Sequence, residues 1–288
     1  MGGLPISAPR CTWKGQLRTP TEWRALNPHM HRFFLQFAFL SNANVQLDEL
    51  HVLYLGVCMY FLGSVLWLLA YELNPTVAPE RNIERVWGIV LAYYTANQVP
   101  CQYSSLTLNS FCNPRAHRTH YPILKGKGAE VKYLTEPLIA AWKEFRRPRN
   151  SHDSRVLGAL QHVLAIQDII GLWSDELLMP EEDVHTLRNE IDKFLADYTY
   201  LGLQADARHQ CLFSAVPKLH YLWHLGNQAM WLSLRRSACW IDEDFVGIMK
   251  RLAARCTASA ELHRVPMMMM TKYGYGDWFE ELFCRLIE

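Results

Sequence analysis

The chain has 288 residues, of which 50% are apolar and 12% aromatic, so it can bury a sizeable core and is not a disordered protein. Its 29 Lys and Arg balance 28 Asp and Glu, which excludes a protein whose overall charge attracts nucleic acid and leaves only local basic patches for that purpose. The eight cysteines include no C-x-x-C pair, a distribution typical of reduced thiols in an intracellular protein.

The first 44 residues are predicted to form an irregular segment, because Pro5, Pro9 and Pro20 interrupt any regular structure there. A short apolar run lies at residues 32–40. It is compatible with a strand or with a buried helical turn, since periodicity alone does not separate the two over so few residues. No aspartate occurs before Asp48.

The longest apolar stretch carries no charge from Val52 to Ala70. Its apolar residues go all the way round a helix, which predicts a fully buried helix from Val52 to Tyr71. Asn74 and Pro75 end it, because proline cannot continue a helix. A stretch of this length also suffices for a single membrane span, which needs about 20 apolar residues.

Most of the remaining chain shows helical periodicity and helix-start signals such as Pro79 and Pro217. These signals predict a mainly α protein, a helical bundle around the long buried apolar helix. Short strands near Phe34 and at Ser237–Ile241 are the only candidates for a sheet. We divide the chain into an irregular segment at residues 1–44, a helical domain at 45–256 and a tail at 257–288.

Two polar groups have the spacing of metal ligands. Asp48 and His51 stand with Glu49 at the mouth of the apolar helix, where they are candidates for metal or proton chemistry or simply cap the helix. His220 and His224 share a helix face, so both imidazoles can reach one ion, or they hydrogen-bond within an aromatic layer.

Two charged groups complete the candidates. The triplet Asp242-Glu243-Asp244 is typical of helix capping and gains a catalytic meaning only if it meets Asp48 in space. A basic segment is a candidate phosphate track, with a solvated loop as the alternative. Its cations are Arg115, Arg118, Lys125, Lys127 and Lys132.

The order of these pieces resembles the second half of a DDE-type transposase of the Plavaka and wider Kyakuja–Dileera–Zisupton group. In that family a D-x-L-H-x-x-x-x-G-V segment precedes a helical insertion, a K-x-H-x-x-x-H-L segment follows, and a glutamate before an aromatic residue comes last. The resemblance covers residues 45–255. The matching residues are Asp48, Leu50, His51, Gly56, Val57, Lys218, His220, His224, Leu225, Glu243 and Phe245.

The resemblance implies an RNase H-like sheet, of which the short strands would be remnants, and a catalytic site that clamps two Mg²⁺ or Mn²⁺ ions. It assigns catalysis to Asp48 and Glu243, and we expect His51, His220 and His224 to join them as metal ligands. It also implies DNA as the partner and a nuclear location. Because residues 1–47 hold no aspartate, this chain is expected to lack strand-transfer activity. The alternatives are a membrane-associated protein and a structural helical interaction module.

Overall fold

The computed structural model describes residues 46–147, 149–257 and 264–274, and at residues 241–244 it describes the backbone alone. The chain divides into two compact units, residues 1–238 and 239–288. The boundary between the two units lies before helix α9 (Trp240–Thr257). The described residues are mainly helical, which confirms the predicted fold class.

No strand occurs among the described residues, so the short strand that the sequence left possible at Ser237–Ile241 does not form. Leu234–Ser237 is instead a 3₁₀ turn (η5), and helix α9 begins at Trp240 and runs to Thr257. Local hydrogen bonds explain the difference, because Arg236 and Ala238 donate their backbone N–H groups to Ser233 and Arg235 within the turn. The candidate strand near Phe34 lies outside the described residues.

The long apolar helix is the core of the first unit, as predicted. It begins as a π-helix, η3 (Leu50–Cys58), and continues as α3 (Met59–Tyr71). Its side chains are almost all buried from Leu50 to Ala70. Phe61 lies at its centre, and its ring contacts the rings of Phe194, Tyr198 and Phe213.

Two described helices, Leu50–Tyr71 and Ser151–Leu172, are long and apolar enough to cross a membrane. In the first, 83% of the most apolar window is buried inside the fold, whereas in the second the share is 39%. The apolar surface of Leu50–Tyr71 is therefore covered by protein, which favours a core helix over one that faces lipid.

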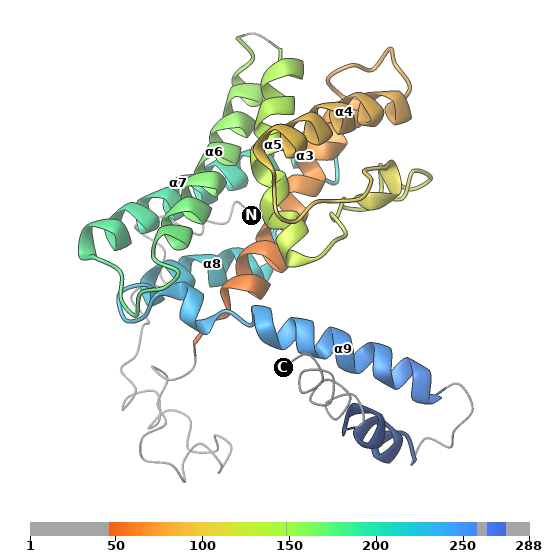
Figure 1. Cartoon of the computed structure of the whole chain (residues 1–288). Coiled ribbons are helices and arrows are strands. Elements are labelled where there is room, and N and C mark those ends of the chain that lie inside the picture. The colour runs from red at the N-terminus through yellow and green to blue at the C-terminus, as the bar shows by residue number, and fades with distance from the viewer. Residues whose placement is uncertain (1–45, 148, 258–263, 275–288) are drawn as a thin grey trace, which may run out of the picture. The chain divides into compact units, whose positions relative to one another are not determined.

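Among the described residues of the first unit, five further helices surround this core (Figure 1). They are α4 (Pro79–Asn97), α5 (Gly128–Phe145), α6 (Ser151–Leu172), α7 (Glu181–Ala207) and α8 (Pro217–Gln228). Helices α4 and α5 flank α3, α6 and α7 pack as a hairpin, and α8 lies beside η3. A loop with one 3₁₀ turn, η4 (Leu108–Ser110), joins α4 to α5.

That loop crosses the core helix at Gly63. The Leu124 N–H donates to the Met59 carbonyl at 2.9 Å, and a Cβ on Gly63 would lie 3.0 Å from both Leu124 N and Pro122 O. These contacts are backbone atoms that cannot rotate away. The glycine therefore permits the close approach that fixes the loop on the helix.

We predict that Gly63→Ala destabilises the protein by about 1–3 kcal/mol, because the added methyl group overpacks this crossing. Gly88→Ala is the matched control, since no atom lies within 4 Å of a Cβ at this position in α4. There alanine should stabilise the helix by about 0.5–1 kcal/mol. Urea unfolding of both variants checks the prediction, and equal effects would contradict the role of Gly63.

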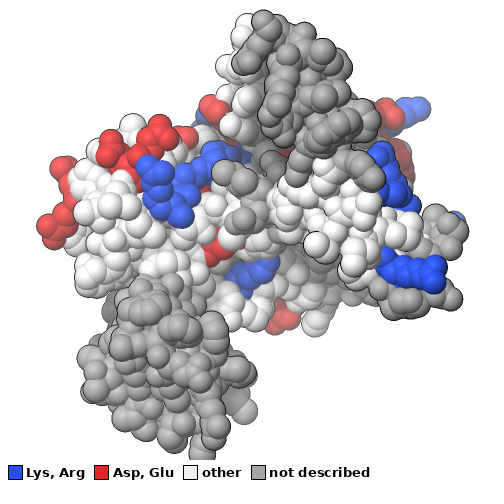
Figure 2. Space-filling model, turned by 60° about the horizontal axis from the view of Figure 1, so that its bottom comes forward, with Lys and Arg blue, Asp and Glu red and all other residues white. Residues whose placement is uncertain are grey.

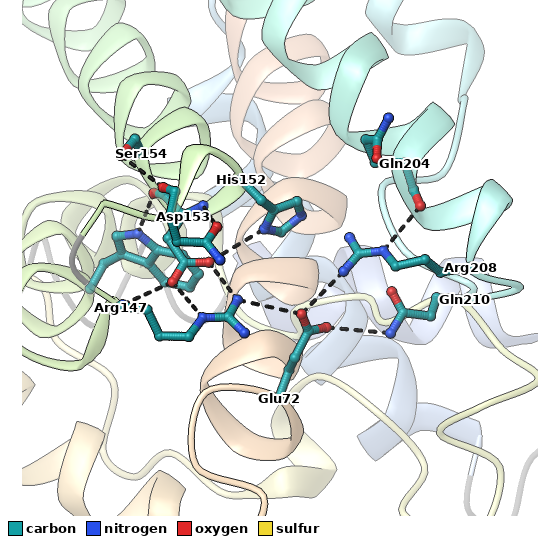
Figure 3. A network of polar contacts seen from close by, with 10 residues as sticks. Glu72, Arg147, His152, Asp153, Ser154, Gln204, Arg208 and Gln210 are labelled. Carbon is teal, nitrogen blue, oxygen red and sulfur yellow. Dashed lines mark hydrogen bonds and ion pairs between the residues drawn. The ribbon is translucent and has the colours of Figure 1, made fainter.

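A polar network joins the ends of three helices (Figure 3). Buried Asp153, near the start of α6, accepts three hydrogen bonds from Arg147, at 2.7–2.9 Å. Arg147 also pairs with Glu72 at the end of α3, at 3.6 Å. Glu72 in turn accepts hydrogen bonds from Arg208 and Gln210 after α7, so one network holds α3, α6 and α7 together.

Candidate functional site

Asp48 acts as the cap of the core helix. Its carboxylate accepts the N–H groups of Leu50 at 3.1 Å and His51 at 3.2 Å, and it also contacts the His51 Nδ1 atom. An aspartate that accepts the first N–H groups of a helix satisfies donors that have no partner within the helix. Asp48 thus caps the helix, which was one of the two roles considered from the sequence. Its carboxylate oxygens already accept backbone N–H groups, so they are less available to bind a metal ion.

Glu49 lies on the other side of the helix start and points inward, with 1% of its surface exposed. Its Oε2 atom is 3.9 Å from Arg235 Nη1. Burial raises the pKa of Tyr54 well above its usual range, and the Glu49 carboxylate adds to the rise. Burial lowers the pKa of Lys132, whereas Glu49 opposes the change. Glu49 therefore belongs to a charged cluster with Arg235 and Lys132, separate from the Asp48 carboxylate with which the sequence grouped it.

Helix α8 runs antiparallel to η3, because two pairs of contacts fix its ends. The Gln228 amide exchanges hydrogen bonds with the Leu47 backbone, at 2.7 and 3.1 Å. At the other end Lys218 Nζ donates to the Leu55 carbonyl at 2.9 Å, and its Cδ would lie 2.5 Å from a Cβ on Gly56. The structure therefore brings together two segments that are about 160 residues apart in the sequence and that carry the family resemblance.

Lys218 also lies near Asp48. Burial lowers the pKa of Lys218, and the Asp48 carboxylate opposes the change. Neither Lys218 nor Gly56 was predicted as a site residue, although both belong to the matched segments. Their positions in the matched segments were the only sign of them in the sequence. The fold shows that the two residues are in contact.

The two histidines of α8 lie in contact, as their spacing predicts. The Nε2 atoms of His220 and His224 are 3.0 Å apart, and the rings meet edge to face with centroids 4.5 Å apart. Burial lowers the pKa of both, and for His224 the neighbouring His220 lowers it further. Trp223 packs edge to face on His224, so the histidines also belong to an aromatic layer.

The predicted meeting of Asp48 with Glu243 lies outside what the structure describes. Glu243 belongs to α9 in the second unit, and its side chain is among those not described. Among the described residues no three His, Cys, Asp or Glu side chains gather closely enough to hold a metal ion. A two-ion Mg²⁺ or Mn²⁺ clamp needs several oxygen ligands around each ion, and it stays a prediction because the side chain of Glu243 lies outside the described residues.

The basic segment presents four of its five cations to solvent. Arg115, Arg118, Lys125 and Lys127 are exposed on the loop between η4 and α5. On the face drawn in Figure 2, the described Lys and Arg side chains form separate groups rather than one continuous field. On that face any attraction for an anion is therefore local, which agrees with the net charge of +1.

The loop is anchored on the core helix. The His117 ring stacks on Tyr71 at a centroid distance of 4.3 Å and an interplanar angle of 1°, and Trp67 Nε1 donates to the His117 carbonyl at 3.0 Å. Lys125 Nζ donates to the Asn109 carbonyl at 2.9 Å. These contacts hold the cations on a fixed support, which lowers the entropy lost when they bind an anion.

Lys132 differs from the other four, because it lies inside α5 and is half-buried. Its ammonium lies 5.9 and 5.6 Å from the ring centroids of Tyr54 and Tyr133. It lines a cleft of about 440 Å³ between α4, α5 and α6, together with Tyr93, Glu136 and Asp168. Burial and then Glu136 raise the pKa of Asp168, while Lys132 opposes the rise. Sequence reasoning missed this cleft, since its walls come from three separate helices.

Comparison with protein-family models, with curated proteins and with solved structures finds no match to this chain.

Proposed function

We propose that this protein is a transposase-derived DNA-binding protein that contacts phosphates through its basic loop and has no strand-transfer activity. One observation carries the proposal. Residues 85–129 contain no Asp or Glu, and within them Arg115, Arg118, Lys125 and Lys127 all point to solvent from one anchored loop. Clustered exposed cations are what binding to a phosphate backbone requires.

The chemistry of the loop predicts binding without sequence preference. Lysine and arginine contacts to phosphates position a protein on DNA but do not read bases. Neutralising four phosphates releases condensed counterions, so the logarithm of the affinity should fall with the logarithm of salt at a slope of about −3.6. The fixed loop keeps the ordering cost low.

Two features of Asp48 support the absence of strand transfer. Asp48 accepts two N–H groups of the helix that it caps. The described groups that contact or face Asp48 include these N–H groups, the His51 ring and Lys218, and such donors do not favour hard divalent ions. We therefore expect no Mg²⁺- or Mn²⁺-dependent cleavage of DNA.

The test compares the wild-type protein with a variant in which Arg115, Arg118, Lys125 and Lys127 are alanine. Fluorescence anisotropy with a labelled duplex is measured over a range of salt concentrations. We expect the wild type to bind with the steep slope given above. The variant should bind more weakly to every sequence and with a slope reduced by up to about 3.6, since up to four phosphate contacts are lost.

A second variant controls for the loss of four positive charges. It replaces two arginines and two lysines that are exposed outside the loop, namely Arg81, Lys143, Arg146 and Lys193. This variant should keep most of the wild-type affinity and slope, because these four cations lie on, or at the end of, three different helices and do not share one loop. Equal losses in the two variants, or no binding by the wild type even at low salt, would overturn the proposal.

A further inference from the structure

The histidine pair of α8 offers a chemistry that DNA binding does not use. His220 and His224 lie one helical turn apart, and both are partly exposed. A helix fixes the separation of such side chains more firmly than a loop does, and Pro217 starts this helix rigidly at its first turn. The pair is thus already arranged before any ligand arrives.

The distance between the two nitrogens suits a chelated ion. With metal–nitrogen bonds of about 2.0–2.1 Å, two Nε2 atoms 3.0 Å apart subtend an angle of about 91–97° at the ion. Angles near a right angle are those of tetragonal Cu²⁺ and Ni²⁺ sites, and imidazole is a ligand that both ions favour. Mg²⁺ and Mn²⁺ prefer oxygen ligands and do not suit this pair.

We propose that His220 and His224 chelate one late first-row transition-metal ion, Ni²⁺ or Cu²⁺, through both Nε2 atoms, with water in the remaining positions. The site shares no residue with the basic loop, so a test of metal binding and a test of DNA binding can give different results. It also differs from the Mg²⁺ site that the family resemblance implies, in ligands, ion and number of ions.

Binding at this pair needs little rearrangement of protons. At 3.0 Å the two neutral rings share one N–H···N hydrogen bond, so one Nε2 carries a proton. Chelation requires that ring to hold its proton on Nδ1 instead, which is a change of tautomer with no net proton release.

The experiment uses the full chain without a histidine tag, freed of metal with a chelator. Ni²⁺ is titrated into the wild type, His220→Ala, His224→Ala and the double variant, with calorimetry as the readout. We expect one equivalent to bind the wild type. Each single variant should lose at least about tenfold in affinity, which corresponds to about 1.4 kcal/mol. His185→Ala is the matched control, because His185 is a single exposed histidine on α7.

Two further measurements show whether the metal ion binds at the histidine pair. Electron paramagnetic resonance of one equivalent of Cu²⁺ on the wild type should show two equivalent nitrogen ligands. Ni²⁺ should raise the melting temperature of the wild type and leave that of the double variant unchanged. Equal Ni²⁺ affinity in the wild type and the double variant would overturn the proposal and leave the pair as a hydrogen-bonded contact. A Cu²⁺ spectrum without two nitrogen ligands would do the same.

Discussion

Arg147→Ala should destabilise the protein by about 3–5 kcal/mol, because it leaves a buried carboxylate without its counter-ion. Asp153 is fully buried, and Arg147 supplies it with three hydrogen bonds. Two of these come from the guanidinium that the substitution removes. The loss also frees Glu72 from one partner, so the ends of α3 and α6 should loosen together. Urea unfolding followed by circular dichroism measures the effect.

Arg155→Ala is a matched control that shows whether burial of the carboxylate causes the loss of stability. Arg155 pairs with Asp197 at 2.7 Å, yet the Asp197 side chain is 17% exposed, against 0% for Asp153. Because pairs that reach solvent contribute little, Arg155→Ala should cost only about 0–1 kcal/mol. Similar losses in both variants would contradict the role of the buried carboxylate.

The same pair gives the stability a dependence on pH. Although burial alone would raise the pKa of Asp153, the hydrogen bonds from Arg147 hold it below its usual range. A lowered folded-state pKa means that the contribution of Asp153 is complete above its unfolded pKa and is lost as pH falls through the folded one. The wild type should therefore lose stability in acid more steeply than Arg147→Ala, in which this contribution is already gone.

Phe61→Ala should cost about 3–5 kcal/mol, which is a large share of the roughly 5–15 kcal/mol by which native proteins are stable. The Phe61 ring is fully buried and touches three aromatic rings from α7 and the loop after it. Removing it opens a cavity where the core helix meets this part of the fold. Helix α7 cannot collapse into the space without moving the hairpin that it forms with α6.

Chemical denaturation of Phe61→Ala beside Leu203→Ala measures that cost. Leu203 also lies on the α7 side, but it is 60% exposed, so its loss should change the stability by no more than about 0.5 kcal/mol. If the two substitutions cost the same, the core helix is not the centre of the fold.

The sequence predicts the elements of this fold better than their contacts. An uncharged run from Val52 to Ala70 predicts a helix that is buried in protein or in lipid, and Pro79 and Pro217 mark helix starts that the structure confirms. The π-helical first half of the core helix was not predicted, because the hydrogen-bond pattern of a helix does not change which residues are apolar. The sequence left a strand possible at Ser237–Ile241 for a related reason, since five residues are too few to show the period of a strand or of a helix.

In the candidate site, too, local contacts were predictable from the sequence and long-range contacts were not. The i, i+4 spacing of His220 and His224 predicted their contact, because a helix fixes it locally. The sequence grouped Asp48 with Glu49, yet neighbouring residues on a helix point about 100° apart, and one caps while the other is buried. Lys132 was grouped with the loop cations although it lies in a cleft. Long-range placement of this kind depends on packing that no local pattern encodes.

The central claim is that the basic loop is the DNA-contacting surface, and lysine protection tests it most directly. The wild-type protein is acylated with a lysine-reactive reagent with and without a DNA duplex at low salt, and each lysine is quantified by mass spectrometry. We predict that DNA protects Lys125 and Lys127, that salt removes the protection, and that exposed Lys143 and Lys193 react equally in both samples. Bound DNA that leaves Lys125 and Lys127 fully reactive, or that protects all four lysines alike, would contradict the claim.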